Sequence, residues 1–308
     1  MILITGGAGF IGLNFVQYLL KNNLHDDIHV IDKLTYAANI SGLSRTRVPV
    51  SIIDIADEIQ VERFFDQHQV DTIIHFAAES HVDNSIKDCM PFVQSNIIGT
   101  INLLDMAVKH NIKKFIHIST DEVFGSLGPT GKFNEESQIN PRNPYSASKA
   151  AAEHFVQAYG NTYKLPYIII NSSNNYGPWQ HSEKLIPLTI KRILKGDKIP
   201  VYGKGDQIRD WIYVEDTCRA IHTILTQGTV GERYCIGGDN EVKNLDLVNM
   251  IMTKMGSPVL VEFVTDRLGH DTRYSTDLTK IKSMWSPTWS LSDGLDRTIE
   301  WMKNENRI

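Results

Sequence analysis

The fold of this chain is decided by Ile2-Leu3-Ile4-Thr5-Gly6-Gly7-Ala8-Gly9-Phe10-Ile11-Gly12. A short buried strand runs directly into glycines at positions 6, 9 and 12, and an apolar-periodic helix follows. Glycine allows the tight turn, the approach of backbone N–H groups to a pyrophosphate, and close packing of the helix on the strand. The spacing is therefore close to the fingerprint of a dinucleotide-binding βαβ unit.

A second strand, Ile28–Ile31, ends at Asp32, which lies 20 residues beyond Gly12. An acid at this place is expected to bind the diol of a ribose. The carboxylate would repel a 2′-phosphate, so NAD is favoured over NADP, although Lys33 weakens this preference slightly. The alternative is a glycine turn that only packs a helix, followed by a chance acid. The complete succession of strand, turn, helix, strand and acid argues against that alternative.

Further strands are expected at residues 50–53, 71–76, 115–118 and 165–170, with helices between them, including a long one over 91–110. This alternation predicts an α/β fold with a doubly wound, parallel Rossmann sheet. The alternation weakens after residue 172, which predicts a smaller, mixed C-terminal lobe for substrate. We therefore expect a dinucleotide-binding domain over 1–172, with a return segment at about 207–236, and a substrate-binding lobe over 173–206 and 237–308.

Composition excludes several classes of function. A net charge of −5 with no run of like charges argues against nucleic-acid binding. The three cysteines have no C-x-x-C spacing, so neither a disulfide framework nor a zinc site is expected, and no metal is predicted. No apolar segment approaches 18 residues, and the first strand starts too close to Met1 for a signal peptide. We therefore expect a cytoplasmic protein without a membrane span.

Polar residues follow two of the expected strands at their carboxyl ends, at Ala77–His81 and Ser119–Glu122. In a parallel sheet these ends share one edge, where ligands bind. Tyr145 and Lys149 follow on an alanine-rich helix, and residues four apart lie on one helix face. The ammonium is expected to lower the pKa of Tyr145 below about 10, which would make it a base. A packed tyrosine beside a solvated lysine is the alternative.

The adjacent acids Asp121 and Glu122 can take opposite roles if their surroundings separate their pKa values, one carboxyl staying protonated and the other ionised. Their place at the end of a central strand favours function over a solvated pair. Lys184, Arg209 and Arg267 bring positive charge to an otherwise acidic chain. Each could be merely solvated, but together they could hold a second, phosphorylated ligand.

These features resemble the extended short-chain dehydrogenase/reductase superfamily in the glycine turn, Thr120 and the Tyr145/Lys149 pair. Within it, the chain resembles the dTDP-glucose 4,6-dehydratase family from Ile2 to about Trp301. The segments that carry this resemblance are 32–36, 77–83, 120–123, 173–178, 207–211 and 269–271. Asp121-Glu122 directly after Thr120 is the most specific of them. The family usually has Arg, Tyr and Pro where this chain has Asn84, Phe124 and Leu268, which leaves the sugar and nucleotide preference open.

The resemblance implies a redox-neutral conversion of dTDP-glucose to dTDP-4-keto-6-deoxyglucose on one bound NAD, which carries a hydride from C4 to C6. Tyr145, supported by Lys149, would remove the C4 hydroxyl proton while Thr120 orients that hydroxyl. Glu122 would take the C5 proton, and Asp121 would protonate the departing C6 hydroxyl. The resemblance also implies a homodimer in which helix 91–110 and the helix after Pro144 form a four-helix interface with their symmetry mates.

Two sets of binding residues complete this hypothesis. The cofactor set is Gly6, Gly9, Phe10, Ile11, Gly12, Asp32, Lys33, Leu34, Thr35, Asp54, Ile55, Ala77, Ala78, Ser80, Asn96, Tyr145, Lys149 and Asn175. The substrate set is His81, Thr120, Asn174, Lys184, Leu185, Pro200, Val201, Tyr202, Arg209, Asn244, Arg267 and His270.

Two rival interpretations remain. One is a sibling enzyme, either a nucleotide-sugar 4-epimerase or a 4,6-dehydratase for a UDP-, CDP- or GDP-sugar. The other is a regulator that senses NAD without catalysis; such relatives commonly lack the tyrosine or the lysine, and this chain has both.

Overall fold

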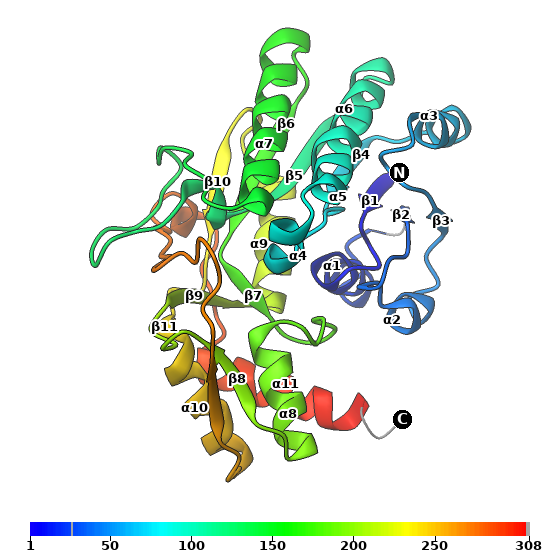
Figure 1. Ribbon diagram of the computed structural model, residues 1–308. Helices are drawn as coiled ribbons and strands as arrows, with labels where there is room; N and C mark the ends of the chain where they lie inside the picture. The colour runs from blue at the N-terminus through cyan, green and yellow to red at the C-terminus, as the bar shows by residue number, and fades with distance from the viewer. Residues whose placement is uncertain (26, 306–308) are drawn as a thin grey trace.

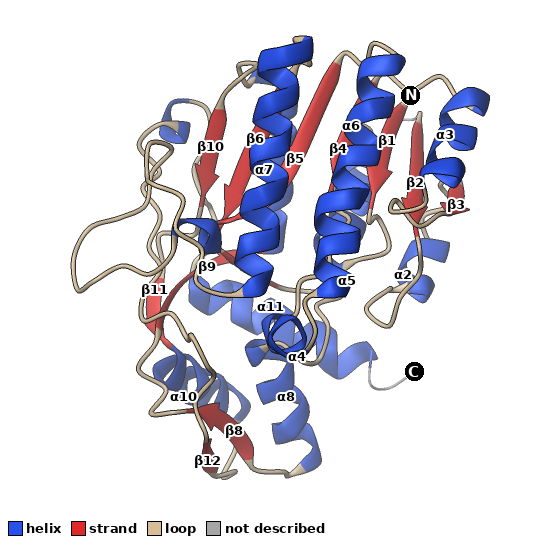
Figure 2. Cartoon of the chain, turned by 45° about the horizontal axis from the view of Figure 1, so that its top comes forward, coloured by secondary structure: helices blue, strands red, loops and turns tan. Residues whose placement is uncertain are grey.

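The computed structural model of the chain describes residues 1–25 and 27–305 (Figure 1). Its larger part is a seven-stranded sheet in the order β10-β6-β5-β4-β1-β2-β3, with every neighbouring pair parallel (Figure 2). The strand order reverses between β1 and β4, the point at which open α/β sheets bind ligands. This confirms the doubly wound fold. The strands are β1 (Ile2–Thr5), β2 (Ile28–Asp32), β3 (Val50–Ile52), β4 (Thr72–His75), β5 (Lys114–Thr120), β6 (Tyr167–Ser172) and β10 (Arg233–Ile236).

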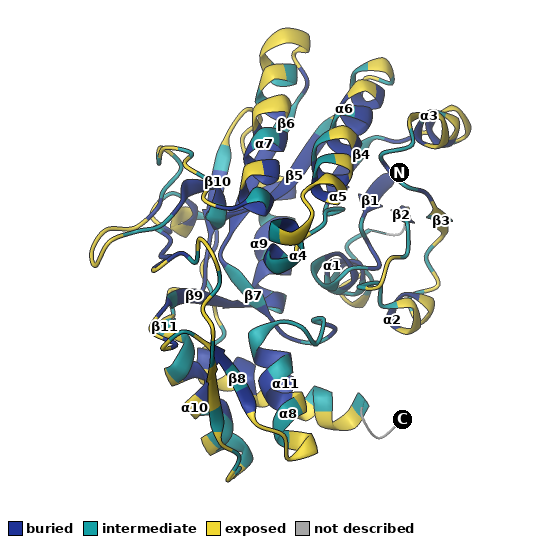
Figure 3. Cartoon of the chain, in the orientation of Figure 1, coloured by how far each residue is buried: buried dark blue, intermediate teal, exposed yellow. Residues whose placement is uncertain are grey.

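Helices cover both faces of this sheet. On one face α3 (Glu58–Gln67), α6 (Gly99–Lys109) and α7 (Pro144–Tyr163) pack through one apolar cluster. On the other, α1 (Phe10–Lys21) and α9 (Val214–Gln227) share a second cluster with the strands. Figure 3 shows the central strands buried, the edge strand β3 largely exposed, and the outer sides of α3, α6 and α7 exposed. Because both faces are covered, the strands are near-continuous apolar runs, which made them visible in the sequence.

The helix expected over residues 91–110 is present from Met90 to Lys109, with a π-helical turn inside it. It begins as the short α5 (Met90–Phe92), continues as the π turn η1 (Val93–Ile98) and ends as α6, and a separate short helix, α4 (Val82–Lys87), precedes it. The π turn contains Asn96, which is buried and bonds to both main-chain groups of Glu79 and to the Ser148 hydroxyl. A π turn of this kind often marks a functional site, and its single inserted residue leaves no signal in apolar periodicity.

The C-terminal part forms a smaller lobe below the large sheet in Figure 1. It contains a three-stranded sheet, β11-β9-β7, and a parallel pair, β12-β8, around its own apolar cluster. Its strands are β7 (Asn174–Tyr176), β8 (Ile199–Tyr202), β9 (Ile208–Tyr213), β11 (Glu241–Lys243) and β12 (Val261–Val264). Its helices are α8 (Leu185–Lys195), α10 (Asn244–Met255) and α11 (Leu291–Glu305). Short elements elsewhere are α2 (Ile40–Ser44), η2 (Asp121–Phe124) and η3 (Ile281–Ser283).

The segment expected to return to the large sheet divides in two. Its first part, β9, pairs with β7 and β11 of the smaller lobe, whereas α9 packs on α1 and β10 pairs with β6 of the large sheet. Among the described residues, no helix has the length and apolar character that crossing a membrane requires.

Candidate active site

A cavity lies along the carboxyl ends of the central strands, at the reversal of strand order. Most of the expected cofactor set lines it: Gly6, Gly9, Phe10, Ile11, Gly12, Asp32, Lys33, Thr35, Ile55, Ala77, Ala78, Ser80, Tyr145 and Lys149. Leu34, Asp54, Asn96 and Asn175 do not line it. Glu79 and Ser119 also line it, from the two polar segments that the sequence placed at this edge, whereas sequence reasoning missed Ser95, Gln180, His181 and Glu183, which line it too. The last three belong to a loop of the C-terminal lobe, and nothing in their spacing relates them to the glycine turn.

The glycine turn at one end of the cavity tolerates no larger residue at two positions. Gly6 has φ +70, and a Cβ there would lie 2.5 Å from the main-chain nitrogen of Ala77. A Cβ on Gly12 would lie 2.3 Å from the carbonyl oxygen of Gly6, so the helix could not approach the turn. Gly9 differs, because a Cβ there would meet only that carbonyl, at 3.2 Å, and would otherwise project into the cavity that Gly9 lines.

Asp32 is held in place by main-chain donors. Its Oδ2 accepts a hydrogen bond from Ala8 N at 2.9 Å, and its Oδ1 accepts one from Leu34 N at 2.8 Å. Burial raises the pKa of Asp32, and these two N–H groups act in the opposite direction. Lys33 donates to Ser95 Oγ at 2.8 Å and lies 3.7 Å from Asp54 Oδ2. Asp54 thus pairs with a residue that lines the cavity but does not line it itself.

Tyr145 and Lys149 lie on the first turns of α7 and both line the cavity. The helix begins sharply because Asn143 and Ser146 form a capping box and Pro144 occupies the first turn. Tyr145 N also donates to Ser85 Oγ at 3.2 Å, which ties α7 to α4. The two functional side chains thus share one face of a helix that is fixed at its start.

One expectation about this pair is wrong. Burial raises the pKa of Tyr145, as does the nearby charge of Glu122, while the Thr120 hydroxyl acts to lower it. Lys149 donates from Nζ to the carbonyl oxygen of Ile118 at 2.8 Å, and burial lowers its pKa to about 8. The desolvation of both groups outweighs the attraction that a four-residue spacing suggests. The sequence showed the spacing but not the burial.

Thr120, Asp121 and Glu122 stand where β5 passes into the 3₁₀ turn η2. Thr120 Oγ1 donates to Asp121 Oδ1 at 3.3 Å and accepts from Glu122 N at 3.2 Å, which caps the turn. Asp121 is buried, and its Oδ2 has no hydrogen-bond partner among the described residues. Burial raises its pKa well above the ordinary value, and the negative charge of Glu122 raises it further. Asp121 is therefore suited to stay protonated.

Glu122 has different surroundings. Burial raises its pKa, but the positive charges of Arg209, Lys184 and Arg267 act in the opposite direction. Two adjacent carboxyls thus occupy environments that push their proton affinities apart, which is the arrangement expected of an acid and a base. The three cations noted in the sequence all act on this one carboxyl.

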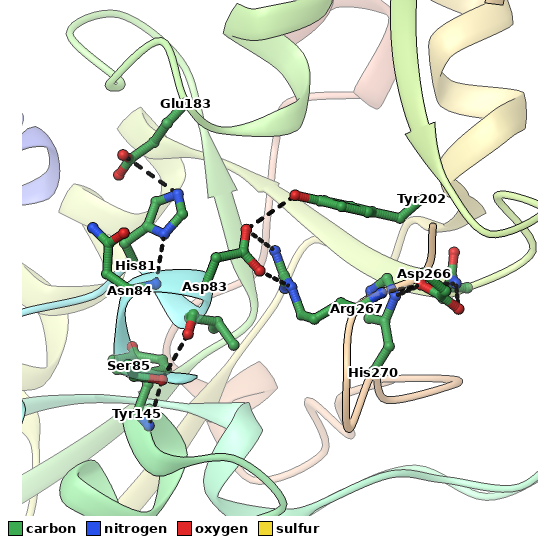
Figure 4. Close-up of polar contacts among 12 residues, drawn as sticks. His81, Asp83, Asn84, Ser85, Tyr145, Glu183, Tyr202, Asp266, Arg267 and His270 are labelled. Atoms are coloured by element: carbon green, nitrogen blue, oxygen red, sulfur yellow. Dashed lines mark hydrogen bonds and ion pairs between the residues drawn. The ribbon is translucent and has the colours of Figure 1, made fainter. Parts of the chain in front are cut away.

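Four residues of the substrate set lie where α4 meets the C-terminal lobe, namely His81, Tyr202, Arg267 and His270 (Figure 4). Asp83 accepts from Arg267 Nε at 2.6 Å and Nη2 at 3.1 Å, and from the Tyr202 hydroxyl at 3.1 Å. His81 caps α4, and its Nε2 lies 3.4 Å from Glu183 Oε2. His270 Nδ1 lies 2.7 Å from Asp266 Oδ1. Sequence reasoning did not assign Asp83 to this site, although it lies within the segment 77–83.

The remaining members of the substrate set divide into two groups. Arg209 donates to the carbonyl of Asp271 and lies 4.2 Å from the ring of Tyr274, while Lys184 donates to the carbonyl of Ser80. The others are either packed among apolar residues of the lobe or have polar atoms without a hydrogen-bond partner. Val201 is buried in an apolar cluster of the lobe, and the partly buried Leu185 packs against it. Pro200 is half-buried, and the side-chain oxygens of Asn174 and Asn244 are buried without a partner in the described part of the chain.

Comparison with known proteins decides the family. The GDP-mannose 4,6 dehydratase family model matches residues 3–298. The chain is 45% identical to the dTDP-glucose 4,6-dehydratase of Salmonella typhimurium, over 97% of this chain and 92% of that protein. The chain belongs to the dTDP-glucose 4,6-dehydratase family. The resemblance seen in the sequence is thereby confirmed.

Solved structures agree with this family membership. The dTDP-glucose 4,6-dehydratase DesIV of Streptomyces venezuelae, solved with NAD bound, superposes with a TM-score of 0.95 at 42% identity, covering 99% of this chain and 97% of DesIV. The UDP-glucose 4-epimerase of Thermotoga maritima has a TM-score of 0.93 at 29% identity, covering 99% of both chains. The fold is thus common to dehydratases and epimerases, whereas the sequence lies closer to the dehydratases.

Proposed function

We propose that this protein is an NAD-dependent hydro-lyase that converts dTDP-glucose to dTDP-4-keto-6-deoxyglucose. The observation that carries the proposal is the pair Asp121 and Glu122 beside Tyr145: Asp121 is buried with its pKa raised well above the ordinary value, whereas three cations act to lower the pKa of the half-buried Glu122. A 4-epimerase needs only a base that acts on the C4 hydroxyl. A dehydration needs, in addition, an acid for the leaving hydroxyl and a base for C5.

The cavity fits NAD at three places. The open space at Gly9 admits a pyrophosphate to the N-terminus of α1, where N–H groups lack partners within the helix. The fixed carboxylate of Asp32 suits a ribose diol, and Tyr145 and Lys149 stand at the far end, where the nicotinamide would lie. When bound, NAD would accept a hydride from C4 of the sugar and return it at C6, and its positive ring would favour the phenolate of Tyr145.

The chain's own residues perform the proton transfers. Tyr145 removes the proton of the C4 hydroxyl, which Thr120 orients, and Lys149 stabilises the resulting negative charge. The ketone formed at C4 makes the C5 proton acidic, and Glu122 takes it and would deliver a proton to C5 again when C6 is reduced. Asp121, which burial keeps protonated, donates its proton to the C6 hydroxyl as it leaves as water. Arg209, Lys184 and Arg267 hold the diphosphate and favour the ionised form of Glu122.

We propose further that residues 173–206 and 237–308 form the substrate-binding lobe, and that the protein is a cytoplasmic homodimer. Exposed apolar side chains on the α5–α6 segment and on α7, among them Met90, Ile98, Phe155 and Tyr163, fit a two-fold four-helix contact. The three free cysteines suit a reducing compartment. Light scattering at micromolar concentration tests the dimer, because a monomer there would contradict it.

Product analysis tests the reaction. The purified protein, with its NAD content measured, is given dTDP-, UDP- and GDP-glucose side by side. We expect dTDP-glucose to yield the 4-keto-6-deoxy sugar, with deuterium from C4 appearing at C6 and solvent deuterium entering at C5. Retention of the C6 hydroxyl with deuterium back at C4 would indicate an epimerase, and absence of any turnover would indicate a regulator.

A further inference from the structure

Helix α7 carries a third ionisable residue in register with Tyr145 and Lys149. Glu153 follows Lys149 by four residues, so the three side chains lie along one face of the helix. Tyr145 and Lys149 line the cavity, whereas Glu153 is fully buried one turn behind them. The proton transfers described above do not use this carboxyl.

Glu153 is joined to the catalytic loop by side chains from two strands. Its Oε2 lies 2.7 Å from Nη1 of Arg233 on β10, and its Oε1 accepts from Nδ2 of Asn171 on β6 at 2.7 Å. Arg233 also donates to Asn171 Oδ1 at 2.6 Å. Asn171 Nδ2 donates in turn to the main-chain carbonyl of Thr120 at 2.9 Å. This network therefore fixes the end of β5 directly before Asp121.

The charge of the same carboxyl also acts on Lys149, which lies one helical turn away. Burial lowers the pKa of Lys149 to about 8, and Glu153 acts to raise it. The other titratable groups that face Lys149 are His75 from β4 and His117 from β5. Burial lowers the pKa of His75 to about 3 and holds that of His117 well below its ordinary value, so both imidazoles stay neutral. Neither histidine competes with Glu153 for the charge of Lys149.

We propose that Glu153, with Asn171 and Arg233, is a positioning network that keeps Lys149 positively charged and fixes the main chain of Thr120. This inference rests on the proposed function, because it acts through the lysine that supports Tyr145. A purely structural ion pair is the competing explanation. Breaking such a pair on one side leaves a buried charge uncompensated and destabilises the fold, while replacing both partners is often neutral.

Four variants separate the two explanations: Glu153→Gln, Arg233→Met, the double variant, and the control Glu241→Gln. Glu241 pairs at 2.7 Å with Arg273, whose exposure of 10% equals that of Arg233, in the C-terminal lobe. Thermal unfolding and the pH dependence of kcat are measured for each. We expect Glu153→Gln to move the alkaline limb of kcat to lower pH by about one unit, because Lys149 loses a negative charge one helical turn away in a buried site. The double variant should regain thermal stability while the alkaline limb of its kcat profile stays at the lower pH. The control Glu241→Gln should lose thermal stability, with its alkaline limb at the same pH as in the parent.

An unmoved limb in Glu153→Gln, or a limb that returns with stability in the double variant, would overturn the proposal. Nitrogen NMR of protein labelled at lysine gives a readout that needs no turnover. If the proposal is right, the pH at the midpoint of the Lys149 titration is lower in Glu153→Gln than in the parent. A parent protein that forms no product at any pH would contradict the proposed function, while the NMR midpoint would still decide the role of Glu153.

Discussion

At one end of the cavity, around Gly6, Gly12 and Asp32, the groups that face the ligand are main-chain N–H groups and one carboxylate fixed by main-chain donors. At the other end, Tyr145 and Lys149 line the cavity, and Thr120, Asp121 and Glu122 lie beside Tyr145 without lining it. Burial shifts the pKa of four of these five residues. We call these two ends the nucleotide end and the reaction end. The nucleotide end depends on backbone geometry, so a substitution that adds a side chain there is expected to be harmful. The reaction end depends on buried ionisable groups, so a substitution that changes their protonation is expected to be harmful.

The largest effect is expected from removing one carboxyl at the reaction end. Asp121→Asn and Glu122→Gln should slow product formation ~10²–10⁴-fold, because each removes a positioned acid or base. Both variants keep Tyr145 and Lys149, so they should still oxidise C4 and then stall. Stopped-flow absorbance of reduced nicotinamide should rise and persist after mixing with dTDP-glucose. Tyr145→Phe should show no rise, and a rise that decays at the parent rate in Glu122→Gln would contradict the role of Glu122.

A smaller effect is expected at the nucleotide end. Asp32→Asn replaces a charged acceptor of the ribose diol by a neutral one, and hydrogen bonds to charged groups contribute about 1.5–3 kcal/mol. NAD should therefore bind about 10–100-fold more weakly, as measured by calorimetry, while the bound fraction still turns over. Asp27→Asn is the control, since that carboxylate lies near the opposite end of β2 and pairs with the terminal amine. Equal affinity in Asp32→Asn and the parent would contradict the role assigned to Asp32.

The dependence on pH should belong to the reaction end. Lys149 carries its charge below its pKa of about 8 and loses it above, so kcat should fall as pH rises through this region, by about tenfold per unit. Glu122 must be ionised, and its raised pKa places the acid limb above the ordinary carboxyl range. NAD affinity should change far less over the same range. Parallel loss of NAD binding above pH 8 would show that the two ends are not independent.

The contrast between the ends also explains how far the sequence could be interpreted. Strands that are buried on both faces can be recognised in the sequence as apolar runs. Positions such as Gly12, where a close contact excludes any side chain, can be recognised as a glycine motif. The raised pKa of Tyr145 was not visible, because burial is set by packing of α7 against β5 and α4. The π turn at Val93–Ile98 could not be predicted either, because it lies within an apolar run of the sequence. The spacing of residues along the chain predicts which of them are neighbours on a helix or strand. How far they are removed from water depends on the packing of the whole fold, which the spacing does not show.

The smallest effect is expected where the lobes meet, at Asp83. This carboxylate holds Arg267 and Tyr202, but both partners of the ion pair remain about one-quarter exposed, and such pairs contribute about 0.2–1 kcal/mol. Asp83→Asn should therefore raise KM for dTDP-glucose up to about fivefold, because Arg267 and Tyr202 lose the anchor that preorders them. The effect on kcat should be smaller than that on KM, since Asp83 acts on the reaction end only through Arg267, one of three cations near Glu122. Glu262→Gln, which breaks a more exposed pair with Lys198 in the same lobe, should alter neither constant. A fall in kcat with KM unchanged would mean that the contact between the lobes positions the reaction end. Arg267 would then act in the chemical step and not in substrate binding.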